Sequence, residues 1–229
     1  MNSVALVRNG RVPGTLEKLV DSATGDLLRH ATAVARAGEA IYRAGDPSED
    51  VLMLREGWAT QVVQLDSGRR QILRVVLPGD FCSYRMVFSP TLDFSIRATT
   101  RARYSRFERA GVKLLLVTRP AAFEAFGSAI LDEDRRLTDL VVNLGRRTAK
   151  ERVAYVILSI LERLNVEGLP AAGPIPFPIR QTDLADMAGI TTVHTSRLLA
   201  DYRRSGVFAL SRGELHLLDR RALERIGRL

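Results

Sequence analysis

The sequence has few of the residues that build metal and redox sites. It contains one cysteine, Cys82, and three histidines among its 229 residues. A single cysteine excludes an intramolecular disulfide and a cysteine-ligated iron–sulfur cluster. The sequence also has no glycine-rich phosphate loop, no metal-spaced set of histidines and glutamates, and no nucleophile elbow. We therefore do not expect an enzyme.

Long hydrophobic runs are also missing. The longest apolar stretch, around residues 153–161, is far shorter than the roughly 20 residues that a membrane span needs. The N-terminus lacks the basic and then apolar pattern of a signal peptide. We therefore expect a cytoplasmic protein without membrane contact. With 46% apolar residues, the chain can still bury a substantial core.

Lysine is scarce, although the chain is basic. The net charge of +8 comes almost wholly from arginine, because the chain has only Lys18, Lys113 and Lys150. Residues 145–229 carry 14 Lys/Arg against 9 Asp/Glu, whereas residues 1–144 carry 20 against 17. The positive excess is denser in the shorter C-terminal part, which is typical of a module that binds a polyanion.

Short β-prone runs alternate with turn residues between about residues 31 and 108. Turn signals such as Asp66-Ser-Gly68 and Pro78-Gly-Asp80 separate them, because proline presets φ and glycine accepts positive φ. Many short strands at regular spacing predict a β-sandwich or barrel. The expected strands are residues 33–37, 40–42, 51–55, 60–65, 71–76, 94–98 and 102–107.

Helical patterns lie on both sides of this region. The first 30 residues indicate short helices, and residues 109–118 predict another, which Arg119-Pro120 ends. A longer helix is expected from Ala121 to about Leu144, with an apolar stripe that can be a coiled-coil seam or a face on a core. We expect a parallel dimer seam, made by Phe123, Phe126, Ile130, Leu137, Leu140, Val141 and Leu144.

Residues 181–204 predict two helices around a tight turn. Thr182 is expected to cap the first helix, Gly189 to end it in the left-handed conformation, and Thr191 to cap the second. We expect the second helix to pack Val193, Leu198, Leu199 and Tyr202 inward and to expose Thr192, His194, Thr195, Ser196, Arg197 and Arg203. This is the helix-turn-helix pattern, although an ordinary helical hairpin has the same outline.

The flanking segments fit a DNA-binding module. A helix is predicted over residues 148–164, after a hinge at Gly145, and a proline-rich loop follows, ending in a short strand at residues 178–180. Residues 207–210 and 214–218 read as a hairpin joined by Ser211-Arg212-Gly213. Such a hairpin beside a helix-turn-helix is typical of a wing.

The order of these parts resembles that of the CRP/FNR superfamily of bacterial transcription regulators over nearly the whole chain. Residues 41–46 (IYRAGD), 51–57 (VLMLREG) and 77–81 (LPGDF) resemble landmarks of its cyclic-nucleotide-binding-type domain. Residues 183–199 resemble its helix-turn-helix, particularly in the branch with a Val-His pair.

The resemblance implies an α+β architecture. It consists of an N-terminal β jelly roll of sensor type with flanking helices (residues 1–119), a dimerisation helix and hinge (residues 120–145), and a C-terminal winged helix-turn-helix (residues 146–229). It also implies a homodimer on palindromic double-stranded DNA, and contact with RNA polymerase if the protein is an activator.

The usual ligand of the family is not expected here. Cyclic-AMP-binding members carry Gly-Glu and Arg-Ser pairs, where this chain has Ser83-Tyr84 and Leu92-Asp93. An aspartate would repel the cyclic phosphate that the arginine holds. Arg85 and Arg97 are nearby cations that could serve a different anion. We therefore expect no cofactor.

Two alternatives remain for the β domain. An unidentified small molecule could bind it, or a haem could, with Cys82, His30 and Met86 as axial ligands. Against haem, Cys82 reads as a small core residue, and His30 as the end of a helix.

The resemblance and the residue chemistry together assign the DNA contacts. Arg197 matches a family arginine that reads guanine, and bidentate contact with O6 and N7 suits its guanidinium. The other expected base contacts are Thr192, Val193, His194 and Ser196. Val193 could instead pack inward or touch a thymine methyl. The expected phosphate contacts are Arg180, Gln181, Thr182, Thr191, Arg203, Arg204 and Arg212.

Overall fold

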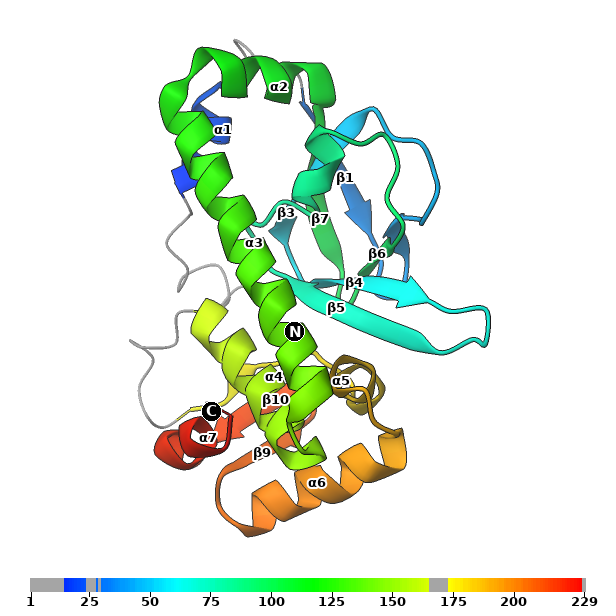
Figure 1. Ribbon diagram of the computed structural model, residues 1–229, viewed down its shortest axis with the longest axis vertical. Helices are drawn as coiled ribbons and strands as arrows, with labels where there is room; N and C mark the ends of the chain where they lie inside the picture. The colour runs from blue at the N-terminus through cyan, green and yellow to red at the C-terminus, as the bar shows by residue number, and fades with distance from the viewer. Residues whose placement is uncertain (1–14, 24–27, 29, 165–172, 228–229) are drawn as a thin grey trace. The chain divides into compact units, whose positions relative to one another are not determined.

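The computed structural model describes residues 15–23, 28, 30–164 and 173–227 (Figure 1). Contacts along the chain define two compact units, one ending at Thr138 and the other beginning at Asp139. The boundary falls inside the long helix α3 (Pro120–Arg146). We describe each unit by itself.

Two antiparallel sheets form the first unit and make its β roll. Their strand orders are β1-β7-β3 and β2-β6-β4-β5. The bounds are β1 His30–Ala35, β2 Ala40–Tyr42, β3 Asp50–Glu56, β4 Ala59–Gln64, β5 Arg70–Val76, β6 Ser95–Ala98 and β7 Ala102–Glu108. All seven expected strands are confirmed, with ends that differ by a few residues. His30 begins a strand, so the expectation that it ends a helix was wrong.

The sheets of the roll enclose one apolar core. Residues 51–54 of β3 are buried on both faces, since one face meets the opposite sheet and the other meets helices. Cys82 also lies in this core and is fully buried, as its apolar neighbours predicted. Burial, with a smaller contribution from Asp80, raises the pKa of the Cys82 thiol to about 12. The thiol is therefore protonated at neutral pH.

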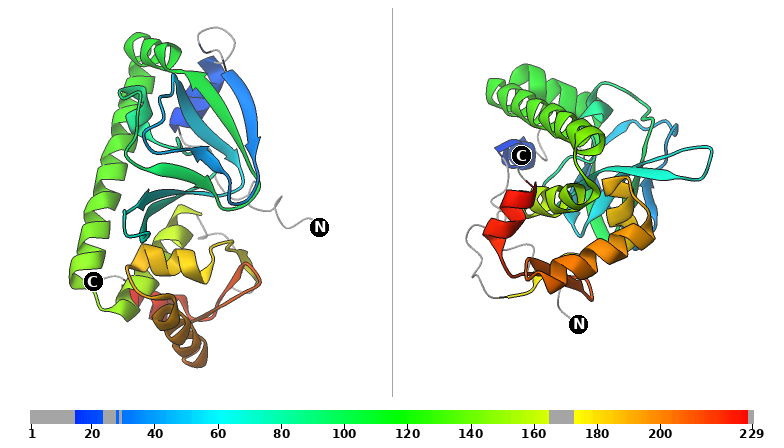
Figure 2. Two further views of the ribbon diagram at one scale, coloured as in Figure 1. Left: turned by 90° about the vertical axis from the view of Figure 1, so that its right-hand side faces the viewer. Right: turned by 60° about the horizontal axis from the view of Figure 1, so that its bottom comes forward.

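Helices cover one side of the roll (Figures 1 and 2). They are α1 (Thr15–Ala23), the 3₁₀ helix η2 (Tyr84–Val87), α2 (Arg109–Thr118) and the first part of α3. α1 agrees with the expected N-terminal helices; residues 1–14, 24–27 and 29 lie outside the described part. Arg119 is extended (φ −124°, ψ 97°) because the proline after it disfavours helical geometry, and this separates α2 from α3.

No single helix in the described ranges has both the length and the apolar character needed to span a membrane. The pair α2 and α3 meets both criteria only when the two are taken together, and it is bent by 112°.

The second unit contains the end of α3, three helices, a small sheet and a C-terminal helix. The helices are α4 (Ala149–Arg163), α5 (Gln181–Ala188) and α6 (Thr192–Arg204), followed by α7 (Arg220–Gly227). The sheet has the order β8-β10-β9, with β8 at Ile175–Pro176, β9 at Phe208–Ser211 and β10 at Glu214–Leu217. The predicted strand at residues 178–180 was wrong, because the pairing with β10 occurs earlier.

The break between α3 and α4 lies slightly later than expected. Gly145 is inside α3, which continues to Arg146. Thr148 then starts α4 with a capping box: its hydroxyl accepts from the Glu151 N–H at 3.4 Å, and its own N–H donates to the Glu151 carboxylate at 2.7 Å. Thr148 therefore starts α4, and Gly145 does not mark the hinge.

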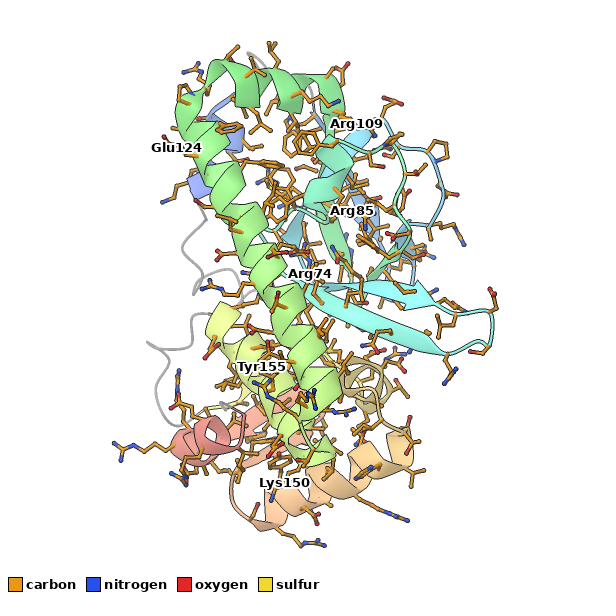
Figure 3. All side chains as sticks on the ribbon, viewed as in Figure 1. Arg74, Arg85, Arg109, Glu124, Lys150 and Tyr155 are labelled. Carbon is orange, nitrogen blue, oxygen red and sulfur yellow. The ribbon has the colours of Figure 1, made fainter. Side chains whose placement is uncertain are left out.

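Tyr155 of α4 fastens the last turns of α3. Its ring lies 4.2 Å from the guanidinium of Arg147, which also donates to Asn143 Oδ1 at 3.2 Å. Burial and the neighbouring Asp139 carboxylate raise the pKa of Tyr155 to about 12, so the phenol remains neutral. Figure 3 labels Tyr155 beside the end of α3.

Candidate nucleic-acid interface

The turn between α5 and α6 depends on Gly189. Its φ of 62° and ψ of 40° are left-handed, which confirms the expected end of the first helix. A Cβ at this position would lie only 3.0 Å from Leu144 Cδ2. Arg152 of α4 donates to Ala188 O at 3.4 Å and to Arg147 O at 2.9 Å. No sequence pattern identifies Arg152 as the residue that holds this turn.

The start of α5 differs from the prediction. Arg180 takes the N-cap position, and its side chain makes no capping hydrogen bond. Thr182 is inside the first turn and exposed, so it does not cap the helix. The consequence is that the Arg180 side chain and the Thr182 hydroxyl both remain at the surface, beside the positive end of the helix dipole.

Thr191 caps α6, as predicted. Its hydroxyl accepts from the backbone N–H of His194 at 3.2 Å. The inward positions of Leu198, Leu199 and Tyr202 are also confirmed, since all three are buried. The hydroxyl of Tyr202 donates to Lys150 O of α4 at 2.7 Å. This bond anchors α6 to the helix beneath it.

Two residues at the start of α6 lie on the opposite helix faces from those predicted, because Val193 was expected to be buried and Thr195 exposed. Thr195 is fully buried and donates to Thr191 O at 3.1 Å, whereas Val193 is 63% exposed. Thr195 lies three residues before Leu198 and seven before Tyr202, so helical spacing puts it on the inner face. Its buried hydroxyl is tolerated because it has a hydrogen-bond partner.

The expected base-contacting residues share the outer face of α6. All five are exposed: Thr192, Val193, His194, Ser196 and Arg197. Among the described residues, the Arg197 guanidinium has no hydrogen-bond or ion-pair partner. Figure 2 shows α6 in orange, following α5 around the turn. This face carries donors, acceptors and the methyl groups of Thr192 and Val193 near a helix start, which are the groups that read base edges.

The hairpin of β9 and β10 is a tight wing. Ser211 pairs with Glu214, so Arg212 and Gly213 alone form the turn, with φ of 51° and 80°. Positive φ at both central positions is the geometry of a type I′ hairpin. Arginine rarely adopts it, and here it puts the side chain at the exposed tip of the wing.

The wing tip and the start of α5 lie together. A pocket of about 330 Å³ is lined by residues 177–181 and 210–214, and Phe177 N donates to Gly213 O at 2.7 Å. The structure thus gathers Arg180, Gln181 and Arg212 from the expected phosphate contacts. Arg203 is exposed near the other end of α6, and Arg204 there pairs with Asp201.

The exposed residues of α3 match only part of the expected seam. Phe123, Ile130, Leu137 and Val141 are 64%, 38%, 44% and 71% exposed. Leu140 and Leu144 are half-buried. The sequence analysis did not select Leu131 and Val142, which are 71% and 45% exposed but lie off the seven-residue repeat.

Phe126 does not belong to this exposed face. It is 3% exposed and contacts the rings of Tyr84 and Phe88 at 5.7 Å and 5.9 Å. A side chain that is already buried within one protomer has little surface left to bury in a dimer. The structure therefore places Phe126 in the core of the roll.

A second pocket, of about 360 Å³, lies between the roll and α3. Its wall includes apolar side chains of β4, β5, η2 and α3, Phe88 and Phe94, and the carboxylates of Asp93, Glu133 and Asp134. Ser83 and Tyr84 line it, and Asp93 pairs with Arg85 at 2.8 Å near its rim. Arg97 is not part of the pocket and donates to Gly38 O at 3.1 Å.

The three candidate ligands of the haem alternative do not line this pocket. Met86 and Cys82 are buried in the core, and His30 is exposed on β1. Within the described ranges, no group of three or more His, Cys, Asp and Glu side chains is arranged to hold a metal ion.

A β roll, a long helix with an exposed apolar face and a winged helix-turn-helix together define a class of DNA-binding regulators with a sensor-type domain. Comparisons with known proteins agree. Residues 151–226 match the family model of the Crp-like helix-turn-helix domain, and residues 32–119 match the cyclic nucleotide-binding domain.

Curated and solved proteins are similar over most of the chain. The nitrogen fixation regulation protein FixK of Bradyrhizobium diazoefficiens is 31% identical over 83% of this chain and 79% of its own length. The transcriptional activator FnrL of Cereibacter sphaeroides is 28% identical over 80% and 74%. The solved structure of FixK2 from Bradyrhizobium japonicum has a TM-score of 0.78 and 25% identity, and the match covers 88% of this chain and 98% of that one.

The chain belongs to the CRP/FNR family, as its motifs predicted. It is a DNA-binding transcription regulator.

Proposed function

We propose that the protein binds promoter DNA as a homodimer on a two-fold symmetric site. The observation that carries this proposal is the outer face of α6, where exposed polar side chains follow a left-handed glycine turn and Arg197 is unpaired among the described residues. α6 lies in the major groove, and the two half-sites are centred about 34 Å apart, one helical turn of DNA.

Base recognition centres on Arg197, which donates to O6 and N7 of a guanine. Thr192, His194 and Ser196 offer donors and acceptors to neighbouring base edges, and the exposed methyl groups of Val193 suit a thymine methyl. The burial of Thr195 supports this set, because it leaves these side chains as the outer face near the start of α6.

Phosphate contacts surround these residues. Arg180, Gln181, Thr182 and Arg212 approach the backbone from the α5 start and the wing, and Thr191 from the α6 cap. Arg203 contacts it farther along α6, and Arg204 contributes less because Asp201 neutralises it. These contacts set affinity and its salt dependence more than sequence preference. The protein acts in the cytoplasm, and activation would add contact with RNA polymerase.

The dimer forms along the exposed stripe of α3, which consists of Phe123, Ile130, Leu137 and Val141. Phe123, Ile130 and Leu137 are seven residues apart and Val141 follows four residues later, and such positions stay on one side of a paired helix. The stripe therefore suits a parallel seam with a second copy. Binding two half-sites through one dimer raises affinity by roughly 10²–10⁴ over a single module.

The test is a variant with Leu137→Glu and Val141→Glu. We expect a monomer by light scattering and a loss of about 100-fold or more in affinity for a two-half-site duplex, because buried glutamates repel across the seam. The matched control is Glu124→Lys, a charge change on the same helix off the stripe, which should remain dimeric. A variant that is monomeric yet binds as tightly as wild type would contradict the proposal.

A second candidate function rests on the pocket of about 360 Å³ beside α3. The family model implies a cyclic nucleotide, but the pocket does not fit one: its lining contributes three carboxylates and one arginine, and Asp93 already neutralises that arginine. The lining favours a mostly apolar small molecule that adjusts DNA binding. None of the proposed haem ligands lines it.

A pocket-filling variant tests this second function. DNA binding is measured with cyclic AMP and with a small-molecule extract of cells, for wild type and for Val63→Trp. We expect no response to cyclic AMP, and a response to the extract that Val63→Trp abolishes. A response that survives filling the pocket would contradict this candidate. A Soret absorbance band of the purified protein would instead favour the haem alternative.

A further inference from the structure

Arg74 is a charged residue inside the roll. It lies on β5 between half-buried Leu73 and buried Val75, and its side chain is only 7% exposed. Its Nη2 donates to Phe81 O at 2.6 Å and also contacts Cys82 O at 3.5 Å. A buried guanidinium is costly unless its charge is paired and its donors are used, so the partner of Arg74 matters.

That partner is Glu133 of α3. Arg74 Nη1 donates to Glu133 Oε2 at 2.7 Å, across 59 residues of sequence. The Glu133 side chain is 20% exposed, and its other cationic contact is Arg136 at 3.9 Å on the same helix. Figure 3 labels Arg74 beside the middle of α3. The pair therefore ties the roll to the helix that carries the proposed seam.

The surroundings of Arg74 keep it charged, so the site next to its guanidinium favours an anion. Burial alone would lower the pKa of Arg74, but the carboxylates of Glu133 and Asp80 raise it above its ordinary value. The guanidinium stays charged, and removing Glu133 would leave a buried cation without its close counter-ion. Such a cation attracts any small anion that can reach it.

Glu133 also lines the pocket beside α3. A ligand in that pocket could join the roll to α3, since residues of both form its wall. The Arg74–Glu133 pair already joins the roll to α3, because Arg74 belongs to β5 and the Glu133 carboxylate belongs to α3.

We propose that the Arg74–Glu133 pair fastens α3 to the roll when no small molecule is bound, so that Glu133 is a built-in anionic ligand for Arg74. The DNA-binding consequence rests on the proposed homodimer. The effect on thermal stability does not depend on the homodimer, so the two predictions can fail separately.

The test uses Glu133→Ala, which opens a space next to Arg74 that acetate can enter. Thermal unfolding is followed with rising sodium acetate, against sodium chloride at the same ionic strength. We expect the variant to unfold on the order of 5–10 °C below wild type, because a buried charge has lost its partner. Acetate should return several degrees of this loss in a saturable way, and chloride should not.

Two controls separate this effect from general ones. Asp134→Ala removes the neighbouring carboxylate of the same pocket wall. This side chain is exposed and has no hydrogen-bond or ion-pair partner in the described part, so its loss should shift the unfolding temperature little. Arg74→Met combined with Glu133→Ala removes the cation as well, and acetate should give it no specific recovery. Equal recovery in all variants, or a Glu133→Ala protein as stable as wild type, would overturn the proposal.

DNA binding gives the functional readout. Wild type should bind its selected site without any added effector, and acetate should restore Glu133→Ala binding at least tenfold while leaving wild type unchanged. Recovery of stability without recovery of binding would overturn the claim that this junction controls DNA binding. Wild type that binds no duplex would instead count against the proposed function, and the thermal result would still decide whether Glu133 is the anion that Arg74 holds.

Discussion

Three arginines of the β roll differ in what they contact from two arginines of the proposed DNA-facing surface. In the roll, Arg74 pairs with Glu133, Arg103 with Glu56, and Arg109 donates to two backbone carbonyls. On the proposed DNA-facing surface, Arg197 and Arg212 make no hydrogen bond or ion pair with a described residue, and both are exposed.

This difference separates structural from functional charge. Paired arginines lower the cost of ordering the roll, because each neutralises a carboxylate or satisfies a carbonyl. Exposed arginines without protein partners keep their charge and donors for a polyanion. The count of 34 Lys and Arg residues thus overstates the cations available to DNA, since several of them pair with carboxylates within the protein.

The largest expected effect comes from a buried arginine of the roll. In Arg109→Ala, the Met86 and Ser48 carbonyls lose their donor, which should lower the free energy of unfolding by about 2–4 kcal/mol. Chemical denaturation measures the loss. The preferred DNA sequence of the folded protein should stay the same. A changed sequence preference would contradict the distinction between arginines that stabilise the roll and arginines that contact DNA.

Arg197→Ala should have the opposite signature. Affinity for the preferred site should fall by ~1–3 kcal/mol with one base position relaxed, because a bidentate contact is lost. Unfolding should be unchanged, since the exposed side chain makes no hydrogen bond or ion pair with a described residue. Binding to duplexes with each base at that position measures the effect; an equal loss on every sequence would show that Arg197 contacts phosphate instead.

Arg212→Asn should lower affinity by less, and by the same factor on all sequences. The slope of log K against log salt should fall by about 0.9, the value for one phosphate contact. Asparagine tolerates the left-handed conformation better than arginine, so the turn is kept while the charge is removed. A sequence-dependent loss would place Arg212 at a base edge.

The smallest effect is expected from an exposed, paired arginine of the roll. Arg106 pairs with Asp50, and its side chain is 52% exposed, so water screens the interaction. Arg106→Ala should change the free energy of unfolding by about 0–1 kcal/mol and leave DNA binding unaltered. A clear loss of DNA affinity would show that the roll also contacts DNA.

Local patterns predicted much of this fold. Turn residues separated the strands of the roll, and Gly189 and Thr191 marked the helix-turn-helix, because their chemistry is local. The burial of Thr195 and the exposure of Val193 could also have been predicted from the sequence. Helical spacing from Leu198 and Tyr202 selects Thr195, but the greater hydrophobicity of valine favoured the other assignment.

Long-range partners could not be predicted. Nothing around Arg74 indicates that its carboxylate comes from Glu133 on a helix 59 residues away. Phe126 similarly follows the apolar pattern of α3, but only the fold shows that it meets the rings of Tyr84 and Phe88. Sequence periodicity gives a face of a helix and not the surface that covers it.

The most direct test of dimeric DNA reading by Arg197 is selection of bound sequences from a random duplex library, without added ligand. Wild type should enrich a two-fold symmetric motif with a guanine in each half, and Arg197→Ala should enrich the same motif with that guanine relaxed. No enrichment, or a motif that Arg197→Ala leaves unchanged, would contradict the account.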